Sequence, residues 1–206
     1  MKYIFMAGAP GSKWSSVSKN IYYSPTVDSS DYSEARTYWH DAPGEMMLMH
    51  LGAYFDPGME FDLPADLTTL SKAELERRFD EPFSGEGVRI IKSHIFAHNI
   101  DFLKHTWPNA PIILVYRGDD ACLDWWIKCG EFNITYPIYN KYYKDLRHMA
   151  KIIADQNQSI LKAWDQYYGT EPTHNHMTAQ FLGLLPVPDG YYQEYAPSDI
   201  KVKVIR

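Results

Sequence analysis

A turn near the start of the chain has the composition of an anion-binding loop. Residues 8–16, GAPGSKWSS, follow a short apolar run and precede a segment with helical periodicity. Such a turn leaves backbone N–H groups pointing outward, and the positive end of the next helix dipole adds to their attraction for a phosphate or sulfate. Lys13 adds a positive charge, and Ser15 and Ser16 add hydroxyl groups. The alternative is a turn at a strand end that binds nothing, because short loop motifs often arise by chance.

Polar side chains lie at the ends of two later apolar segments. Residues 87–94, GVRIIKSH, are expected to form a strand, in which Lys92 and His94 would point to the same side and face one reacting group. A histidine placed there is a candidate general base, although a lone strand histidine is more often packed or exposed. Arg117 ends the next apolar segment, residues 110–117, APIILVYR.

The first loop resembles two known anion-binding motifs. It is similar to the adenylate-kinase form of the Walker A pattern, with one glycine fewer before Lys13. It also resembles the 5′-phosphosulfate loop of the sulfotransferase family, in which a proline is followed by a basic residue, Ser, Gly and two hydroxyl residues. Pro10, Ser12 and Ser15 match that loop, whereas Gly11 replaces the basic residue and Lys13 replaces the glycine.

The sulfotransferase resemblance covers most of the chain in order. Residues 92–94, KSH, match the Lys, Thr/Ser, His motif that ends a central strand in cytosolic sulfotransferases. Residues 112–126 resemble the family's strand and helix for the donor's 3′-phosphate, with Arg117 as the arginine and Asp124 in place of the phosphate-binding serine. Residues 177–188 resemble a Phe, Leu, Gly, Leu segment of the family, whereas its later Arg, Lys, Gly phosphate motif is not found.

This resemblance implies a P-loop NTPase-like, three-layer sulfotransferase fold and the donor 3′-phosphoadenosine 5′-phosphosulfate. The acceptor would be a hydroxyl or amine of a small molecule or carbohydrate. His94 would be the catalytic base, while Lys92 and Lys13 would stabilise charge on the sulfuryl group and its leaving phosphate. No metal is expected, because the transferred group carries less charge than a phosphoryl group. The donor-binding residues implied are Pro10, Gly11, Ser12, Lys13, Trp14, Ser15, Ser16, Arg117 and Asp124.

Two other functions stay open at this point. Asp119, Asp120 and Asp124 could bind Mg²⁺ in a P-loop kinase that uses ATP, although acids in a first helical turn more often cap the helix and complement its dipole. Alternatively, the chain is a catalytically degenerate nucleotide-binding module in which Gly11 and Asp124 have removed donor affinity. The HNH segment, residues 174–176, has no accompanying ligands and is interpreted as a polar helix start.

Composition limits the other classes of function. The 206 residues are enough for one domain, with a cap or insertion at residues 22–67, whose aromatic residues 37–40, together with residues 142–146, could line an acceptor pocket or pack in the core. A net charge of −6 without a basic run argues against nucleic acid or an anionic membrane as partner. Cys122 and Cys129, on one predicted helix, are too far apart to pair, which suggests either a reducing compartment or simple packing in the core, and a cytoplasmic location is expected. The oligomeric state is left open.

The order of the predicted elements favours a parallel α/β sheet with helices on both faces. A first strand leads into a helix at residues 12–21, and short joints connect strand, helix, strand and helix between residues 87 and 132. Residues 22–67 show no clear period and predict loops and short helices. Ser71 and Glu74 form a capping-box pattern that starts a helix. Further helices are predicted at residues 139–168 and 173–182, and an edge strand at residues 200–205.

Overall fold

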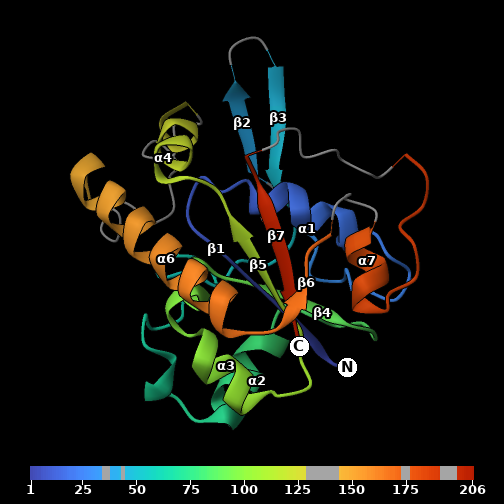
Figure 1. Cartoon of the computed structure of the whole chain (residues 1–206). Helices are drawn as coiled ribbons and strands as arrows, with labels where there is room; N and C mark the ends of the chain where they lie inside the picture. The colour runs from blue at the N-terminus through green and yellow to red at the C-terminus, as the bar shows by residue number, and fades with distance from the viewer. Residues whose placement is uncertain (34–37, 43–44, 129–143, 173–176, 191–198) are drawn as a thin grey trace.

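A five-stranded mixed sheet forms the centre of the α/β fold. The computed structural model describes residues 1–33, 38–42, 45–128, 144–172, 177–190 and 199–206. The strand order is β4-β1-β5-β7-β6 (Figure 1). Strand bounds are β1 Tyr3–Gly8, β4 Arg89–Lys92, β5 Ile112–Tyr116, β6 Gly169–Thr170 and β7 Lys201–Ile205.

Strands β4, β1 and β5, which lie side by side, are parallel, as predicted. β1 pairs with β4 on one side and with β5 on the other, with Met6 opposite Lys92 and Gly8 opposite Val115. The chain therefore passes from β1 to one neighbour and then crosses to the opposite one. The carboxyl ends of strands at such a reversal are where open α/β sheets bind ligands. The loops that follow β1, β4 and β5 all begin at this edge.

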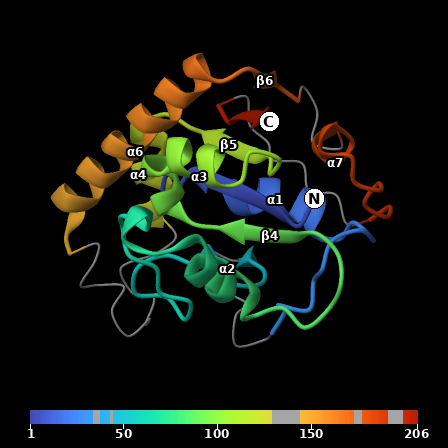
Figure 2. The same ribbon diagram turned by 90° about the horizontal axis from the view of Figure 1, so that it is seen from below.

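Helices cover both faces of the sheet, as predicted. Tyr3, Phe5 and Ala7 of β1 pack in one core cluster with helices α2, α3 and the C-terminal half of α6, and Ile4 and Met6 pack in another with α1 and α7. Figure 2 shows α6 and α7 on opposite sides of the sheet. Helix bounds are α1 Trp14–Tyr22, α2 Lys72–Asp80, α3 Ile100–Thr106, α4 Asp119–Lys128, α6 Leu146–Gln166 and α7 Met177–Leu182.

Several boundaries agree with the sequence and have a local cause. Ser71 accepts a hydrogen bond at Oγ from the N–H of Glu74 at 3.2 Å, which confirms the predicted start of α2. Asp145 caps α6 by accepting from the N–H of His148 at 2.8 Å. Residues 144 and 145 of the helix predicted over 139–168 are therefore not helical, and residues 139–143 lie outside the described residues. Among the described helices, none is long and apolar enough to cross a membrane.

Three structural predictions were wrong. Residues 22–67 contain an antiparallel hairpin, β2 Tyr38–Ala42 and β3 Glu45–His50, rather than only loops and short helices. β7 is not an edge strand, because it pairs with β5 on one side and with β6 on the other. β4 ends at Lys92, and a 3-10 turn, His94–His98, follows it. Ser93 starts that turn by accepting a hydrogen bond at Oγ from the N–H of Ile95 at 3.3 Å.

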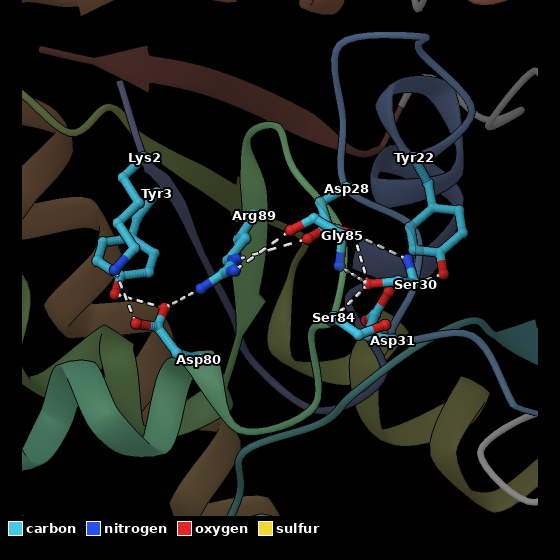
Figure 3. Close-up of polar contacts among 10 residues, drawn as sticks. All are labelled: Lys2, Tyr3, Tyr22, Asp28, Ser30, Asp31, Asp80, Ser84, Gly85 and Arg89. Carbon is cyan, nitrogen blue, oxygen red and sulfur yellow. Dashed lines mark hydrogen bonds and ion pairs between the residues drawn. The ribbon is translucent and has the colours of Figure 1, made fainter.

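A polar network fixes the amino ends of β1 and β4. Lys2 and Tyr3 each donate to the carboxylate of Asp80 at 2.7 Å, and Arg89 donates to the same carboxylate (Figure 3). Arg89 also lies 3.6 Å from the carboxylate of Asp28. This network lies at the edge opposite the loops described below, so we interpret it as structural.

Candidate functional site

The loops after β1, β4 and β5 meet in direct contact. The ring Nδ1 of His94, which follows β4, hydrogen-bonds the carbonyl of Gly8 at the end of β1. The Nη1 of Arg117, which follows β5, donates to the carbonyl of Gly11 at 3.2 Å. The first loop, His94 and Arg117 are far apart in the sequence but meet in the structure. The first loop lies between the two side chains and contacts both.

Glycines allow the first loop to pack closely. At Gly11 the φ angle is +79°, and a Cβ atom would lie 2.0 Å from the carbonyl oxygen of Cys122 in α4. At Gly8 a Cβ atom would lie 2.7 Å from Oγ of Ser12. The N–H of Ser12 donates to the carbonyl of Ala9 at 3.0 Å, which closes the turn. Only glycine fits both positions without displacing neighbours.

The loop ends in a helix start that carries an unpartnered hydroxyl. Ser12 is completely buried, and its Oγ has no hydrogen-bond partner among the described residues. Lys13 is the N-cap of the nine-residue helix α1 and makes no side-chain capping hydrogen bond. A buried polar atom without a partner is uncommon in native proteins, so this hydroxyl points to a group that completes it. Together with the N-terminal end of α1, it forms a candidate anion site.

The other predicted loop residues lie around this helix start. Lys13 has a φ angle of 60°, and its Nζ lies 3.9 Å from the ring centroid of Trp125 in α4. Trp14 is buried, whereas Ser15 and Ser16 are half-buried in the first turn of α1. The ammonium group of Lys13 is thus near the loop but rests on an aromatic face.

His94 is enclosed by aromatic rings and a carboxylate. Its ring stacks on Trp14, with centroids 4.1 Å apart, and meets the ring of Tyr54 edge-on at 5.6 Å. Its Nε2 lies 3.8 Å from the carboxylate of Asp56. Because a carbonyl only accepts, the contact with Gly8 requires a proton on Nδ1, which leaves Nε2 as the basic nitrogen. Burial lowers the pKa of His94 below 6.5, and Asp56 and the Gly8 carbonyl oppose that shift.

Asp56 is a site residue that sequence reasoning missed. It is completely buried and accepts hydrogen bonds from the Oγ of Ser93 at 2.5 Å and from the N–H of His94 at 2.6 Å. It therefore holds the start of the turn that carries His94. The signal in the sequence is a single carboxylate within the apolar segment LGAYFDPG, residues 51–58, just before a Pro-Gly turn.

Lys92 does not face the same group as His94, which corrects the prediction of a shared strand face. It is 2% exposed, and its Nζ donates to the carbonyl of Leu51. The reason is that β4 ends at Lys92, so the period-two alternation does not reach His94. Burial lowers the pKa of Lys92 to about 8, while the nearby carboxylate of Asp31 opposes the shift.

Two further charged residues, Asp31 and Lys19, are buried near Lys92. Asp31 accepts from the hydroxyl of Tyr22 at 2.9 Å and from the N–H of Ala53 at 2.7 Å. Lys19 of α1 is also buried, and burial lowers its pKa to about 8. Neither Asp31 nor Lys19 was identified from the sequence, because both lie in segments without a motif.

Arg117 is buried and ion-paired. Its Nε donates to Oδ2 of Asp199 at 2.8 Å, in addition to the contact of its Nη1 with Gly11. The side chain of Asn157 in α6 donates to the Arg117 carbonyl at 2.8 Å. The guanidinium is thus held beside the first loop, and its partner Asp199 was not predicted.

The acidic residues Asp119 and Asp120 lie in the first turn of α4, where they complement the helix dipole. Oδ1 of Asp119 accepts from Asn157 at 2.6 Å, and Asp120 and Asp124 are exposed. In the part of the chain that the structure describes, no group of three or more His, Cys, Asp or Glu residues could hold a metal ion. Burial raises the pKa of the Cys122 thiol to about 12, so this cysteine is not a nucleophile at neutral pH.

Some predicted features fall on residues outside the described part of the chain. Cys129 and residues 174–176 lie outside the described residues, as do parts of the aromatic segments at 37–40 and 142–146.

Comparison of the chain with protein-family models, curated proteins and solved structures found no match. What the site does must therefore be inferred from its residues and their contacts.

Proposed function

We propose that this chain is a sulfotransferase with a P-loop NTPase-like fold, which moves a sulfuryl group from 3′-phosphoadenosine 5′-phosphosulfate to a hydroxyl or amine acceptor. One observation carries the proposal. A loop suited to an anion, a histidine with a basic Nε2 and a buried arginine are in direct contact at the carboxyl edge of three parallel strands.

The first loop holds the phosphosulfate end of the donor. The N-terminal N–H groups of α1 and the helix dipole attract its negative oxygens. The buried Oγ of Ser12 gains an acceptor when an anion is bound, which explains a hydroxyl that otherwise has no partner. Lys13 is the N-cap of α1, beside the proposed anion site, and its ammonium group rests on the Trp125 ring. When the donor binds, this group moves from the ring and balances charge on the leaving phosphate.

His94 acts as the general base. The acceptor oxygen or nitrogen attacks sulfur, the bond between sulfur and the bridging oxygen of the donor breaks, and the acceptor proton passes to Nε2. The imidazolium that forms is stabilised by Asp56 at 3.8 Å and oriented by the Gly8 carbonyl. Because His94 is only 4% exposed, the ring of Trp14 or Tyr54 must move before an acceptor reaches Nε2.

Arg117 holds the 3′-phosphate of the donor. Its guanidinium lies beside the first loop and is always charged, and its planar donors match the oxygens of a phosphate.

Lys92 acts from a greater distance than Lys13 and makes no contact with the donor. It stays mostly protonated at neutral pH and contributes positive potential behind the loop, while its Nζ remains bonded to Leu51.

Calorimetry with three nucleotides tests the proposal. We expect 3′-phosphoadenosine 5′-phosphate to bind more tightly than adenosine 5′-phosphate or ATP with Mg²⁺. Arg117→Ala should remove the advantage of the 3′-phosphate, and Arg117→Lys should restore part of it. His94→Ala should keep this binding and abolish sulfuryl transfer in an acceptor screen. Preference for ATP with Mg²⁺, or no binding of any nucleotide, would overturn the proposal.

A further inference from the structure

Arg117, which we assign to the 3′-phosphate, is already paired with a carboxylate of the protein. Oδ2 of Asp199 accepts from Nε of Arg117 at 2.8 Å, and the two side chains are 39% and 10% exposed respectively. Oδ1 of Asp199 is buried and has no partner in the described part of the chain. The carboxylate is thus desolvated on one oxygen and compensated on the other, which makes the pair less favourable than a fully satisfied one.

We propose that Asp199 competes with the donor's 3′-phosphate for Arg117 and is displaced when the donor binds. The inference rests on the proposed function, because that function places a phosphate on Arg117. A carboxylate and a phosphate on one guanidinium repel each other, and the low-dielectric surroundings of a buried arginine strengthen that repulsion. A phosphate carries more charge than a carboxylate and offers more acceptor oxygens, so it can replace the carboxylate.

The fold allows the displacement without unfolding β7. Lys201 pairs with Tyr116 in the sheet, and Ile200 is buried in the core, so the backbone on the C-terminal side of Asp199 is held. The side chain of Asp199 is partly exposed and can rotate toward solvent. Rotation also hydrates Oδ1, which offsets part of the lost ion pair.

Asp199 is therefore a specificity-determining residue. A nucleotide with a 3′-hydroxyl has no charge with which to replace the carboxylate, so the ion pair stays closed and Arg117 adds little to its binding. A nucleotide with a 3′-phosphate opens the pair and gains the contact, but its affinity is reduced by the cost of opening. Removing the carboxylate charge of Asp199 should raise the affinity only for the nucleotide that carries a 3′-phosphate.

Calorimetry with 3′-phosphoadenosine 5′-phosphate and adenosine 5′-phosphate tests this inference. We expect Asp199→Asn to bind the first nucleotide roughly tenfold more tightly than the wild type and the second unchanged. The matched control is Asp165→Asn, which removes the same charge from an exposed position at the C-terminal end of α6. That end leads to β6, which pairs with β7 next to the amino end of β5, away from Arg117. The control should bind like the wild type.

A double-mutant cycle separates competition from general electrostatics. In an Arg117→Ala background, Asp199→Asn should have no effect on either nucleotide, because the contested guanidinium is gone. Weaker binding by Asp199→Asn would show that Asp199 positions Arg117, and equal binding would show no competition. Either result overturns this inference while the wild-type preference for the 3′-phosphate still supports the proposed function. If neither protein prefers the 3′-phosphate, both fail.

Discussion

The imidazole of His94 stacks on the indole of Trp14, with ring centroids 4.1 Å apart and planes inclined by 25°. Trp14 is the first residue of α1, and His94 is the first residue of the turn after β4. The stack therefore joins the candidate anion loop to the candidate base. It also removes the imidazole from water, which is the main reason that the pKa of His94 is lowered.

Removing this stack should raise the pKa of His94. In the wild type, an NMR titration of the His94 ring should give a pKa below 6.5. Trp14→Leu exposes one face of the imidazole, so the protonated form is better hydrated and the pKa should move up toward 6.5. Trp14→Phe, which keeps an aromatic face, should show a smaller change. An unaltered titration in Trp14→Leu would contradict burial by Trp14 as the cause.

Replacing Asp56 by Asn should move the acid limb of the transfer rate to lower pH. The Asp56 carboxylate raises the pKa of His94, so its loss lowers that pKa further and keeps His94 unprotonated in more acidic solution. The maximal rate should fall about tenfold to a hundredfold, because the imidazolium loses its counter-charge. Asn can still accept from Ser93 and His94, and Asp165→Asn serves as the control. A limb that moves to higher pH would refute this role of Asp56.

A methyl group at Gly11 should destabilise the protein strongly. Gly11→Ala places Cβ against the carbonyl of Cys122 and requires alanine to adopt a φ angle of +79°. We expect urea unfolding to show a loss of at least about 2 kcal/mol in the free energy of unfolding. Gly118→Ala is the matched control near the same site. A Cβ there meets no atom within 4 Å, so its cost should stay within about 0.5 kcal/mol. Equal costs would mean that the loop does not pack on α4 as described.

The parts of this site that the sequence predicts are those that depend on local pattern. The buried strands β1 and β5, the glycine turn between β1 and α1, and the cap at Ser71 follow from apolar runs and turn residues that are contiguous in the chain. The carboxyl ends of parallel strands then bring the first loop and Arg117 together. The strands, the turn and the cap need only local information, whereas the meeting of the first loop with Arg117 also needs the parallel pairing of β1 with β5.

The parts that could not be predicted depend on contacts between distant segments. Asp56 and Asp199 reach His94 and Arg117 only after the chain has folded, and no spacing rule connects them. The N–H of Ser93 still donates to the carbonyl of Met6 in β1, but the N–H of His94 donates to Asp56 and the Oγ of Ser93 accepts from the N–H of Ile95, so β4 stops before His94. A period-two pattern cannot reveal that competition. The hairpin at β2 and β3 was missed because its segment lacks a clear alternation.

Lys92 should contribute stability that rises with pH between about 8 and 10. Its pKa is about 8 in the folded protein and 10.5 in the unfolded chain, so the unfolded state binds more protons in this window. The free energy of unfolding therefore increases as pH rises through the window, and the cost of the buried charge is fully present below pH 8. Lys19 adds a contribution of the same sign. Cys122, whose pKa burial raises to about 12, opposes the trend from about pH 9, and the buried Tyr22, whose pKa burial also raises, opposes it from about pH 10.

Urea unfolding of Lys92→Met at pH 7.5, 8.5 and 9.5 isolates that contribution. Methionine has a similar length and no charge, so the variant should show a smaller rise than the wild type and keep the share that belongs to Lys19. Lys128→Met, at an exposed position on α4, should keep the full rise and so controls for the change in net charge. If Lys92→Met shows the same slope as the wild type, the ammonium group of Lys92 is hydrated in the folded protein. Lys92 would then provide no buried positive potential behind the anion loop.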